Sequence, residues 1–335
     1  MTSSTRHRQM AFVIDLNKCI GCQGCTIACK RLWTTAPGLE AAYWMNVETV
    51  PGRGYPRDWA GRGGGFDKGR PKPGREPTPE EYGIPFEFDY SARLFSGKRD
   101  RGRPRAAADW APNWEEDQGA GAYPNTYFFY LPRMCNHCDR PACAEACEAG
   151  AIRKRPEDGL VLLDPDRCDG SRACVAACPY AKTFFDAAKA KAHKCHGCFP
   201  RLEAGLAPAC VAQCTGRAMH VGFLDDGAAS VHKLVRQWGV ALPLMDGFGT
   251  GPNVFYIPPF IGPAVEGPDG TAGAAARIPD NYLASLFGPD VRTALRVLRA
   301  ERRKRGRGEP SELMDLLIGR DARALLGHLQ PHPSR

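Results

Sequence analysis

Three observations predict an α+β fold for this chain of 335 residues. Short β-prone segments alternate with short helix candidates, fifteen cysteines gather in four runs beside them, and a long stretch rich in Gly, Pro and Arg separates the first run from the second. The same order of strand, loop and helix occurs twice around the cysteines. We therefore predict two small modules of one kind, a long irregular insert and a helical C-terminal tail.

The strand candidates are short runs of apolar and β-branched residues bounded by turn residues. They lie at residues 10–15, 126–131, 151–155, 160–164 and 220–224. The third and fourth predict a hairpin that turns at Glu157, Asp158 and Gly159. A short helix is expected over residues 26–32, directly after the first cysteine run.

The insert spans residues 33–125 and is densest in Gly, Pro and Arg from residue 51 to 105. Irregular stretches of this length inside a compact protein are usually functional or bound to a partner. We interpret the insert as a surface that wraps a partner subunit; disorder in the free subunit is the alternative.

The tail contains two predicted amphipathic helices. Apolar residues recur at intervals of three and four, which places them on one helix face: Val291, Ala294, Leu295 and Leu298. A second helix is expected after Pro310. Their expected role is packing, on the core of this chain or on a partner.

The cysteine runs carry the chemistry. They are Cys19-x2-Cys22-x2-Cys25-x3-Cys29, Cys135-x2-Cys138-x4-Cys143-x3-Cys147, Cys168-x5-Cys174-x3-Cys178 and Cys195-x2-Cys198-x11-Cys210-x3-Cys214. The first has the bacterial ferredoxin spacing, in which three close thiolates hold one iron-sulfur cube and the fourth ligates a different cube. The chain is therefore expected to hold paired clusters.

This exchange of the fourth ligand predicts four metal sites. Three are [4Fe-4S] sites: Cys19, Cys22, Cys25 and Cys214; Cys29, Cys195, Cys198 and Cys210; Cys135, Cys138, Cys143 and Cys178. Cys147, Cys168 and Cys174 remain for the fourth. The first and last runs then form one ferredoxin-like module (1–32 with 190–225), the middle runs form a second (126–189), and residues 226–335 are a C-terminal extension.

The fourth site lacks one thiolate. In a complete run a cysteine would stand three residues after Cys168, where this chain has Ser171. Three thiolates most simply hold a [3Fe-4S] cluster. The alternative is a [4Fe-4S] cluster whose last iron takes the Ser171 alkoxide, the Asp169 carboxylate or water, although oxygen ligands suit this iron less well than thiolate does.

Composition argues against other classes of protein. Disulfide scaffolds are usually short secreted chains, and zinc sites normally use cysteines in fours without the extra cysteine seen here. The net charge of +8 is modest, and no aromatic and basic nucleic-acid module is present. No stretch approaches the length of a membrane span, and the N-terminus does not resemble a signal peptide. This favours the cytoplasm, unless a partner carries the folded chain across the membrane.

Several segments resemble a known family. They are Met134–Cys143, Ala151–Arg155, Glu157–Gly159, Cys178–Tyr180 and Phe199–Gly205. They are similar to the iron-sulfur β subunits in the dimethyl sulfoxide reductase superfamily of molybdenum enzymes. The branch includes nitrate, selenate, chlorate and perchlorate reductases and dimethylsulfide and ethylbenzene dehydrogenases. Residues 82–89, 111–121 and 208–214 look most similar to perchlorate reductase β subunits.

The resemblance implies an electron-transfer subunit without a catalytic residue of its own. A catalytic α subunit would hold a molybdopterin cofactor near the cluster of Cys19, and a c-type cytochrome or haem subunit would exchange electrons at the three-cysteine cluster. In the nitrate reductase relatives a tryptophan stands where this chain has Ser171, and the cluster there is [3Fe-4S]. Folded complexes of this family commonly reach the periplasm on a signal carried by the α subunit, in anaerobic respiration.

Two other functions remain open from the sequence. Formate dehydrogenase or hydrogenase complexes also use subunits with four clusters, but these normally keep sixteen cysteines. A freely diffusing polyferredoxin carrier would need neither the insert nor the tail. Near the cluster cysteines, His137, His193 and His196 are expected to form hydrogen bonds or pack, Lys194 and Arg172 to tune potentials, and Trp33 to pack.

Overall fold

The computed structural model describes residues 8–39, 42–52, 61–63, 65–67, 70–72, 74–75, 119–122, 124–266 and 271–318. Most of the predicted insert lies outside these ranges. The proposed wrapping of a partner by the insert therefore concerns residues that are largely not described. Two of the segments that resemble perchlorate reductase β subunits, 82–89 and most of 111–121, also lie outside them.

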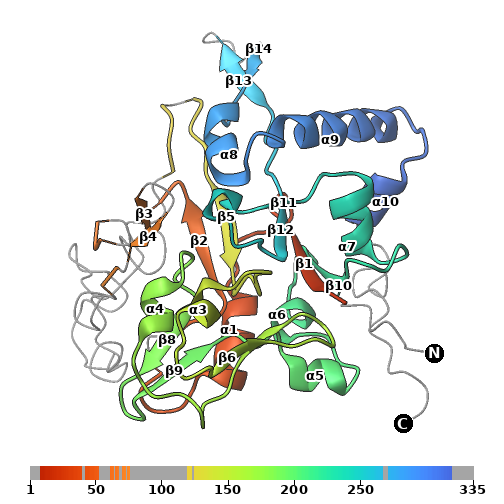
Figure 1. Cartoon of the computed structure of the whole chain (residues 1–335). Helices are drawn as coiled ribbons and strands as arrows, with labels where there is room; N and C mark the ends of the chain where they lie inside the picture. The colour runs from red at the N-terminus through yellow and green to blue at the C-terminus, as the bar shows by residue number, and fades with distance from the viewer. Residues whose placement is uncertain are drawn as a thin grey trace, which may run out of the picture.

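A four-stranded sheet occupies the centre of the described chain (Figure 1). Its order is β10 (Met219–Phe223), β1 (Met10–Asp15), β12 (Val254–Ile257) and β11 (Leu242–Pro243). Strand β1 runs antiparallel to β10 and parallel to β12. Strands β1 and β10 were expected from sequence, whereas β11 and β12 were not.

Every residue of β1 is buried, because both faces of the sheet are covered. Successive side chains of a strand point to opposite faces. Phe12 and Ile14 accordingly pack in one apolar cluster, with the cysteine-bearing segments and apolar residues between 278 and 295. Ala11 and Val13 pack in a second, with Leu298 and apolar residues between 313 and 317. The sheet therefore joins the cysteine-bearing part to the tail.

The cysteine-bearing part consists of short helices and two hairpins. The helices are α1 (Gly24–Trp33), α3 (Ala142–Glu145), α4 (Ala173–Ala177), α5 (Phe199–Glu203) and α6 (Ala209–Ala212). The hairpins are β6 (Ile152–Lys154) with β7 (Val161–Leu163), and β8 (Thr183–Asp186) with β9 (Lys191–Lys194). Helix α1 packs on α6, and α3 packs on α4. Segments far apart in sequence are thus brought together.

A second buried strand pair lies beside this part. Strand β2 (Asn46–Val50) pairs antiparallel with β5 (Phe129–Arg133), and all five residues of β2 are buried. Strand β5 begins three residues later than the expected strand. Strand β2 lies inside the predicted insert, so this piece of the insert belongs to the core. A short hairpin, β3 (Gly65–Asp67) with β4 (Arg70–Lys72), follows it.

The C-terminal extension covers one end of the sheet (Figure 1). It contributes β11 and β12 to the sheet. Its other described elements are α7 (Ser230–His232), the π-helical turn η1 (Lys233–Gln237), the 3-10 turn η2 (Asp246–Phe248), the hairpin β13 (Pro263–Glu266) with β14 (Thr271–Ala276), α8 (Asp280–Phe287), α9 (Val291–Gly306) and α10 (Glu312–Ile318). The four apolar residues of α9 named above are all buried. These helices therefore pack on the core of this chain.

Replacement of a buried residue of α9 tests that packing. Leu298 is fully buried, and its truncation to Ala leaves a cavity, so we expect Leu298→Ala to lower the free energy of unfolding by about 3 kcal/mol. Arg299→Ala, at the exposed neighbouring position, is the control and should change it by less than about 0.5 kcal/mol. Chemical unfolding measures both; equal effects would contradict the packing described.

Candidate metal centres

The structure gathers the cysteines into four groups, named here sites A to D. Site A has Cys19, Cys22, Cys25 and Cys214; site B has Cys29, Cys195, Cys198 and Cys210; site C has Cys135, Cys138, Cys143 and Cys178; site D has Cys147, Cys168 and Cys174. In each of sites A to C the four cysteines line one pocket. The pockets contain about 330, 290 and 360 Å³ of atom-free space.

Site D differs from the others. Its three cysteines pack in one buried cluster with Ile152, Val161 and Ala192, and the Cys174 thiol lies within electrostatic reach of Cys147 and Cys168. Ser171 is exposed, and its backbone N–H donates to Oδ1 of Asp169 at 3.0 Å. Hydrogen bonds from the Ser171 backbone and hydroxyl hold the pKa of the Asp169 carboxyl below its usual value. The Asp169 carboxylate, one of the two candidate oxygen ligands, is thus occupied by hydrogen bonding to Ser171.

Left-handed backbone turns shape these loops. The residue just before the second cysteine of a run has a positive φ in three loops: Gly21 (67°), His137 (44°) and Gly197 (67°). Gly170, just before Ser171, has a φ of 80°. The residues that follow Cys22 and Ser171 match as well, with φ 57° at Gln23 and 63° at Arg172. Ser171 therefore occupies the backbone position that a second cysteine has elsewhere.

Backbone amides point at the sulfurs in a repeated pattern. The N–H groups of Ala151, Lys182 and Ala218 donate to the sulfurs of Cys147, Cys178 and Cys214 at 3.3, 3.4 and 3.3 Å. In each pair the donor follows the cysteine by four residues. Hydrogen bonds to sulfur stabilise the negatively charged thiolate, which is the form that binds metal. The loops are thus arranged to hold thiolates.

Burial opposes that ionisation. Desolvation raises the pKa of the Cys19 thiol to about 11 and the pKa values of Cys25, Cys29, Cys138 and Cys174 to about 12. Cys22 is the exception: it is exposed, and hydrogen bonds from Thr215 and Gly24 lower its pKa. The five thiols with raised pKa values are neutral at pH 7 without a cation beside them. Metal binding there must release protons.

The groups suit clusters better than single ions. Among the described residues, no three or more His, Cys, Asp or Glu side chains are placed to hold one metal ion. The thiols instead come together in fours from separate segments, with hydrogen-bond donors aimed at several sulfurs. Thiolates are soft ligands, and iron-sulfur clusters are among the metal groups that such ligands bind. The residues present therefore fit iron-sulfur cubes.

Three aromatic side chains border site B: Trp33, Trp44 and His196. Trp33 Nε1–H donates to the Cys198 sulfur at 3.2 Å, so Trp33 does more than pack. The ring of His196 stacks edge-on against Trp33 and Trp44, at centroid distances of 4.4 and 5.2 Å. His193 lies outside the pockets, with Nε2 3.8 Å from Asp186. Of the tuning residues expected from sequence, Arg172 stacks on Phe185, and Lys194 is buried beside sites B and C.

A buried polar group that sequence reasoning missed lies beside these sites. Arg133 and Glu48 form an ion pair at 3.0 Å, and Lys182, which is fully buried, donates to Asn46 Oδ1. Burial and the Arg133 charge lower the pKa of Lys182 to about 7, while the Glu48, Cys178 and Cys195 charges oppose that shift. No local sequence pattern marks these contacts, because strand pairing and a turn create them.

Comparison with known proteins agrees with these sites. Residues 126–224 match the family described as a 4Fe-4S dicluster domain. The chain is 59% identical to the perchlorate reductase subunit beta of Dechloromonas aromatica over 313 residues, which cover 93% of this chain and 94% of the relative. It is 52% identical to the chlorate reductase subunit beta of Ideonella dechloratans and 51% identical to the selenate reductase subunit beta of Thauera selenatis, each over 93% of this chain and 96% of the relative.

The chain belongs to the perchlorate, chlorate, selenate and nitrate reductase family of β subunits. It is therefore an iron-sulfur electron-transfer subunit of an oxidoreductase complex. Among the described helices of this β subunit, none is both long and apolar enough to cross a membrane.

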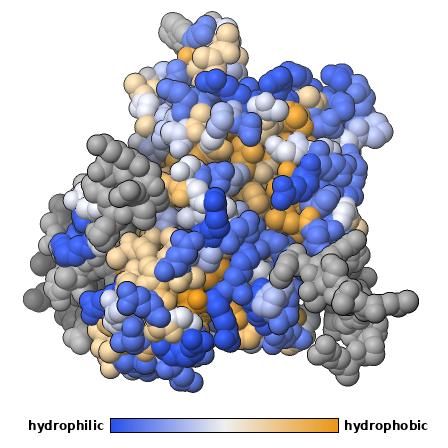
Figure 2. Space-filling view, viewed as in Figure 1, coloured by the Kyte–Doolittle hydropathy of each residue, from blue (hydrophilic) through white to orange (hydrophobic). Residues whose placement is uncertain are grey.

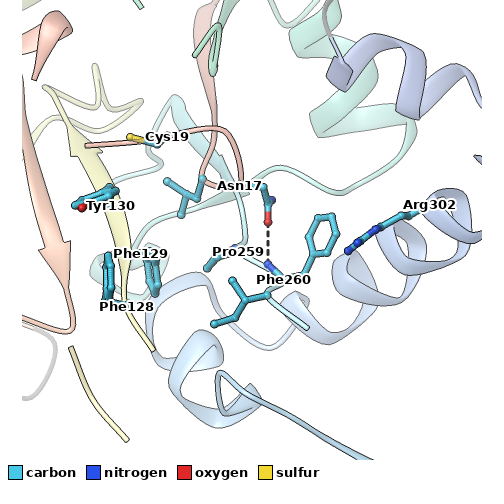
Figure 3. A pocket seen from close by; sticks show the side chains of 10 residues that line it. Asn17, Cys19, Phe128, Phe129, Tyr130, Pro259, Phe260 and Arg302 are labelled. Carbon is cyan, nitrogen blue, oxygen red and sulfur yellow. Dashed lines mark hydrogen bonds between the residues drawn. The ribbon is translucent and has the colours of Figure 1, made fainter. Parts of the chain in front are cut away.

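An open groove lies against site A of the β subunit (Figure 3). Phe128, which directly precedes β5, and Tyr130 of β5 form one wall, and Phe260 and Arg302 lie opposite. Cys19 lines the groove as well as site A. Asn17 Oδ1 accepts a hydrogen bond from the Phe260 N–H at 2.9 Å, which fixes the floor. Figure 2 shows that apolar residues reach the surface in the middle of one face of the molecule. The groove gives a partner access to the edge of site A.

The left-handed turn of site B can be tested with a pair of glycines. Gly197 and Gly239 have φ values of 67° and 60°, so Ala costs about 1 kcal/mol of backbone energy at either. At Gly197 the added Cβ would also lie 2.7 Å from Leu160 Cδ2, whereas nothing lies within 4 Å at Gly239. We expect Gly197→Ala to lower the thermal midpoint and the bound iron more than Gly239→Ala, by melting curves and iron assay. Equal losses would contradict the close packing of this loop.

Proposed function

We propose that this β subunit holds three [4Fe-4S] clusters, in sites A, B and C, and one [3Fe-4S] cluster in site D. One observation carries the proposal: three times, four cysteines from separate segments line a single pocket. Each set also follows the ferredoxin exchange of the fourth ligand between paired runs. Bound clusters would supply one-electron chemistry. The residues of this chain would hold them, shield them and donate hydrogen bonds to their sulfurs.

The three-iron cluster in site D is supported by the chemistry of Ser171. Its hydroxyl and N–H are engaged with Asp169, and both side chains are exposed. Neither oxygen is held in the desolvated position that a strong ligand needs. A cube at site D would therefore lose its fourth iron readily.

We further propose that the chain conducts electrons for a molybdenum catalytic subunit that reduces perchlorate or chlorate, and has no catalytic residue of its own. The names of two relatives support this substrate class. The catalytic subunit docks at the groove beside site A, where Cys19 meets open surface. A c-type cytochrome or haem subunit exchanges electrons at site D. The assembled complex works in the periplasm, after export together with the catalytic subunit.

Replacement of Ser171 by Cys tests the cluster set. Because the backbone at Ser171 matches that at Cys22, a thiol there can supply the missing ligand. The native chain should bind about fifteen irons, three sets of four and one of three, and show the EPR signal of an oxidised [3Fe-4S] cluster. Ser171→Cys should bind about sixteen irons and lose that signal.

Ser171→Ala is the matched control and should keep both the native iron count and the signal. If the native chain binds about sixteen irons without that signal, and the alanine variant gains the signal, the Ser171 oxygen completes the cube. The proposed three-iron site would then be wrong.

A charge placed in the groove tests the docking of the catalytic subunit. Phe128 is 51% exposed at the groove wall, and Phe128→Glu puts a carboxylate where an apolar partner surface should be buried. We expect the affinity for the catalytic subunit to fall roughly tenfold or more, in a pull-down titration. Leu206→Glu changes a side chain of similar exposure, 49%, away from the groove and should leave binding unchanged. Equal binding by both variants would place the partner elsewhere.

A further inference from the structure

Sites B and C exchange side chains across the boundary between them. His137 belongs to the loop of site C, between Cys135 and Cys138, but its Nε2 lies 3.9 Å from the sulfur of Cys195 in site B. Lys194 directly precedes Cys195 of site B, but its ammonium group also lies within electrostatic reach of Cys135 and Cys143 in site C. Each site therefore receives a side chain from the loop of the other.

The hydrogen bonds of His137 determine which nitrogen carries its proton. The N–H of Val161 donates to Nδ1 at 3.0 Å, so Nδ1 must be the unprotonated nitrogen. His137 is 1% exposed, and burial and the Lys194 charge keep the pKa of its imidazole well below the usual value. A neutral imidazole whose Nδ1 accepts a bond carries its hydrogen on Nε2. That N–H is directed at the Cys195 sulfur.

Lys194 is charged in the same boundary. It is 3% exposed, and its Nζ donates to the carbonyl oxygens of Val161 and Cys195. Both acceptors are carbonyl oxygens, as suits an ammonium donor, and cluster cysteines of both sites lie nearby. The dielectric constant is low at this buried position, so a positive charge there acts strongly on both sites.

We propose that His137, as a donor to a sulfur of site B, and Lys194, as a cation beside site C, raise the reduction potentials of the clusters in these two sites. This inference rests on the proposed function, since it needs clusters in both sites. Reduction adds one electron to a cluster, breaks no bond and increases its negative charge. A donor on a ligand sulfur, or a cation beside it, stabilises the reduced form more than the oxidised form.

His137→Asn removes the donor to Cys195 with little other change. Asn tolerates the positive φ at this position, and its Oδ1 can accept the Val161 N–H as Nδ1 does. Its amide is too short to reach the Cys195 sulfur. In a potentiometric EPR titration of the full, anaerobically purified chain, we expect one [4Fe-4S] signal to shift to lower potential. His137→Gln, which keeps an N–H near the Nε2 position, should shift it less.

Lys194→Met removes the charge. We expect the largest shift to lower potential in one of the two [4Fe-4S] signals that His137→Asn leaves unchanged, because Cys135 and Cys143 belong to site C. His193→Asn is the control: its ring contacts Asp186 and none of the cluster cysteines, so no signal should move. The three-iron signal of site D serves as an internal reference in every variant.

The outcomes separate this inference from the proposed function. Missing signals or a low iron count in the native chain would reject the four clusters themselves. A complete set of signals, all unmoved in His137→Asn and Lys194→Met, would reject the proposed effect of these two residues and leave the four clusters standing. The proposed effect would also be contradicted if both variants shifted the same signal most, or if Asn and Gln at position 137 gave equal shifts.

Discussion

The desolvation of cysteine sulfur constrains most of this structure. Ten of the fifteen cysteines are buried and four are half-buried. Thiolates there repel one another and lose the stabilisation of water, which is why burial raises so many thiol pKa values. Iron supplies the compensating positive charge, and the protein supplies the remainder through backbone N–H groups, the Trp33 indole and buried cations. A fold that buries these sulfurs must therefore bring their compensation with them.

The local architecture follows from that requirement. Left-handed turns let short loops present successive amides and thiols inward, and short helices direct the last cysteine of a run toward a different group. The sheet of β10, β1, β12 and β11 then holds the first and last runs side by side. Because β1 is buried on both faces, the C-terminal helices stabilise the same strand that leads into site A. The tail thus supports the cysteine loops without contributing a ligand.

Cysteine spacing alone predicted which residues the structure brings together, because ligand exchange between paired runs leaves a pattern in the sequence. The pattern of apolar and turn residues in the sequence predicted β1, β10, the hairpin of β6 and β7 and helix α9, because each of these elements depends on local periodicity. It did not predict β11 and β12, the bond from Trp33 to Cys198, the contact of His137 with Cys195 or the environment of Lys182. Those features join residues distant in sequence, and only the packed fold determines them.

The central claim is that clusters are shared between runs as sites A to D describe. Anomalous diffraction at the iron absorption edge, from crystals of the loaded subunit, tests it most directly. We expect four separate iron positions, one inside each cysteine group, with three irons beside Cys147, Cys168 and Cys174 and four in each of the others. An iron cluster bound by both Cys25 and Cys29, or an empty group among the four, would contradict the account.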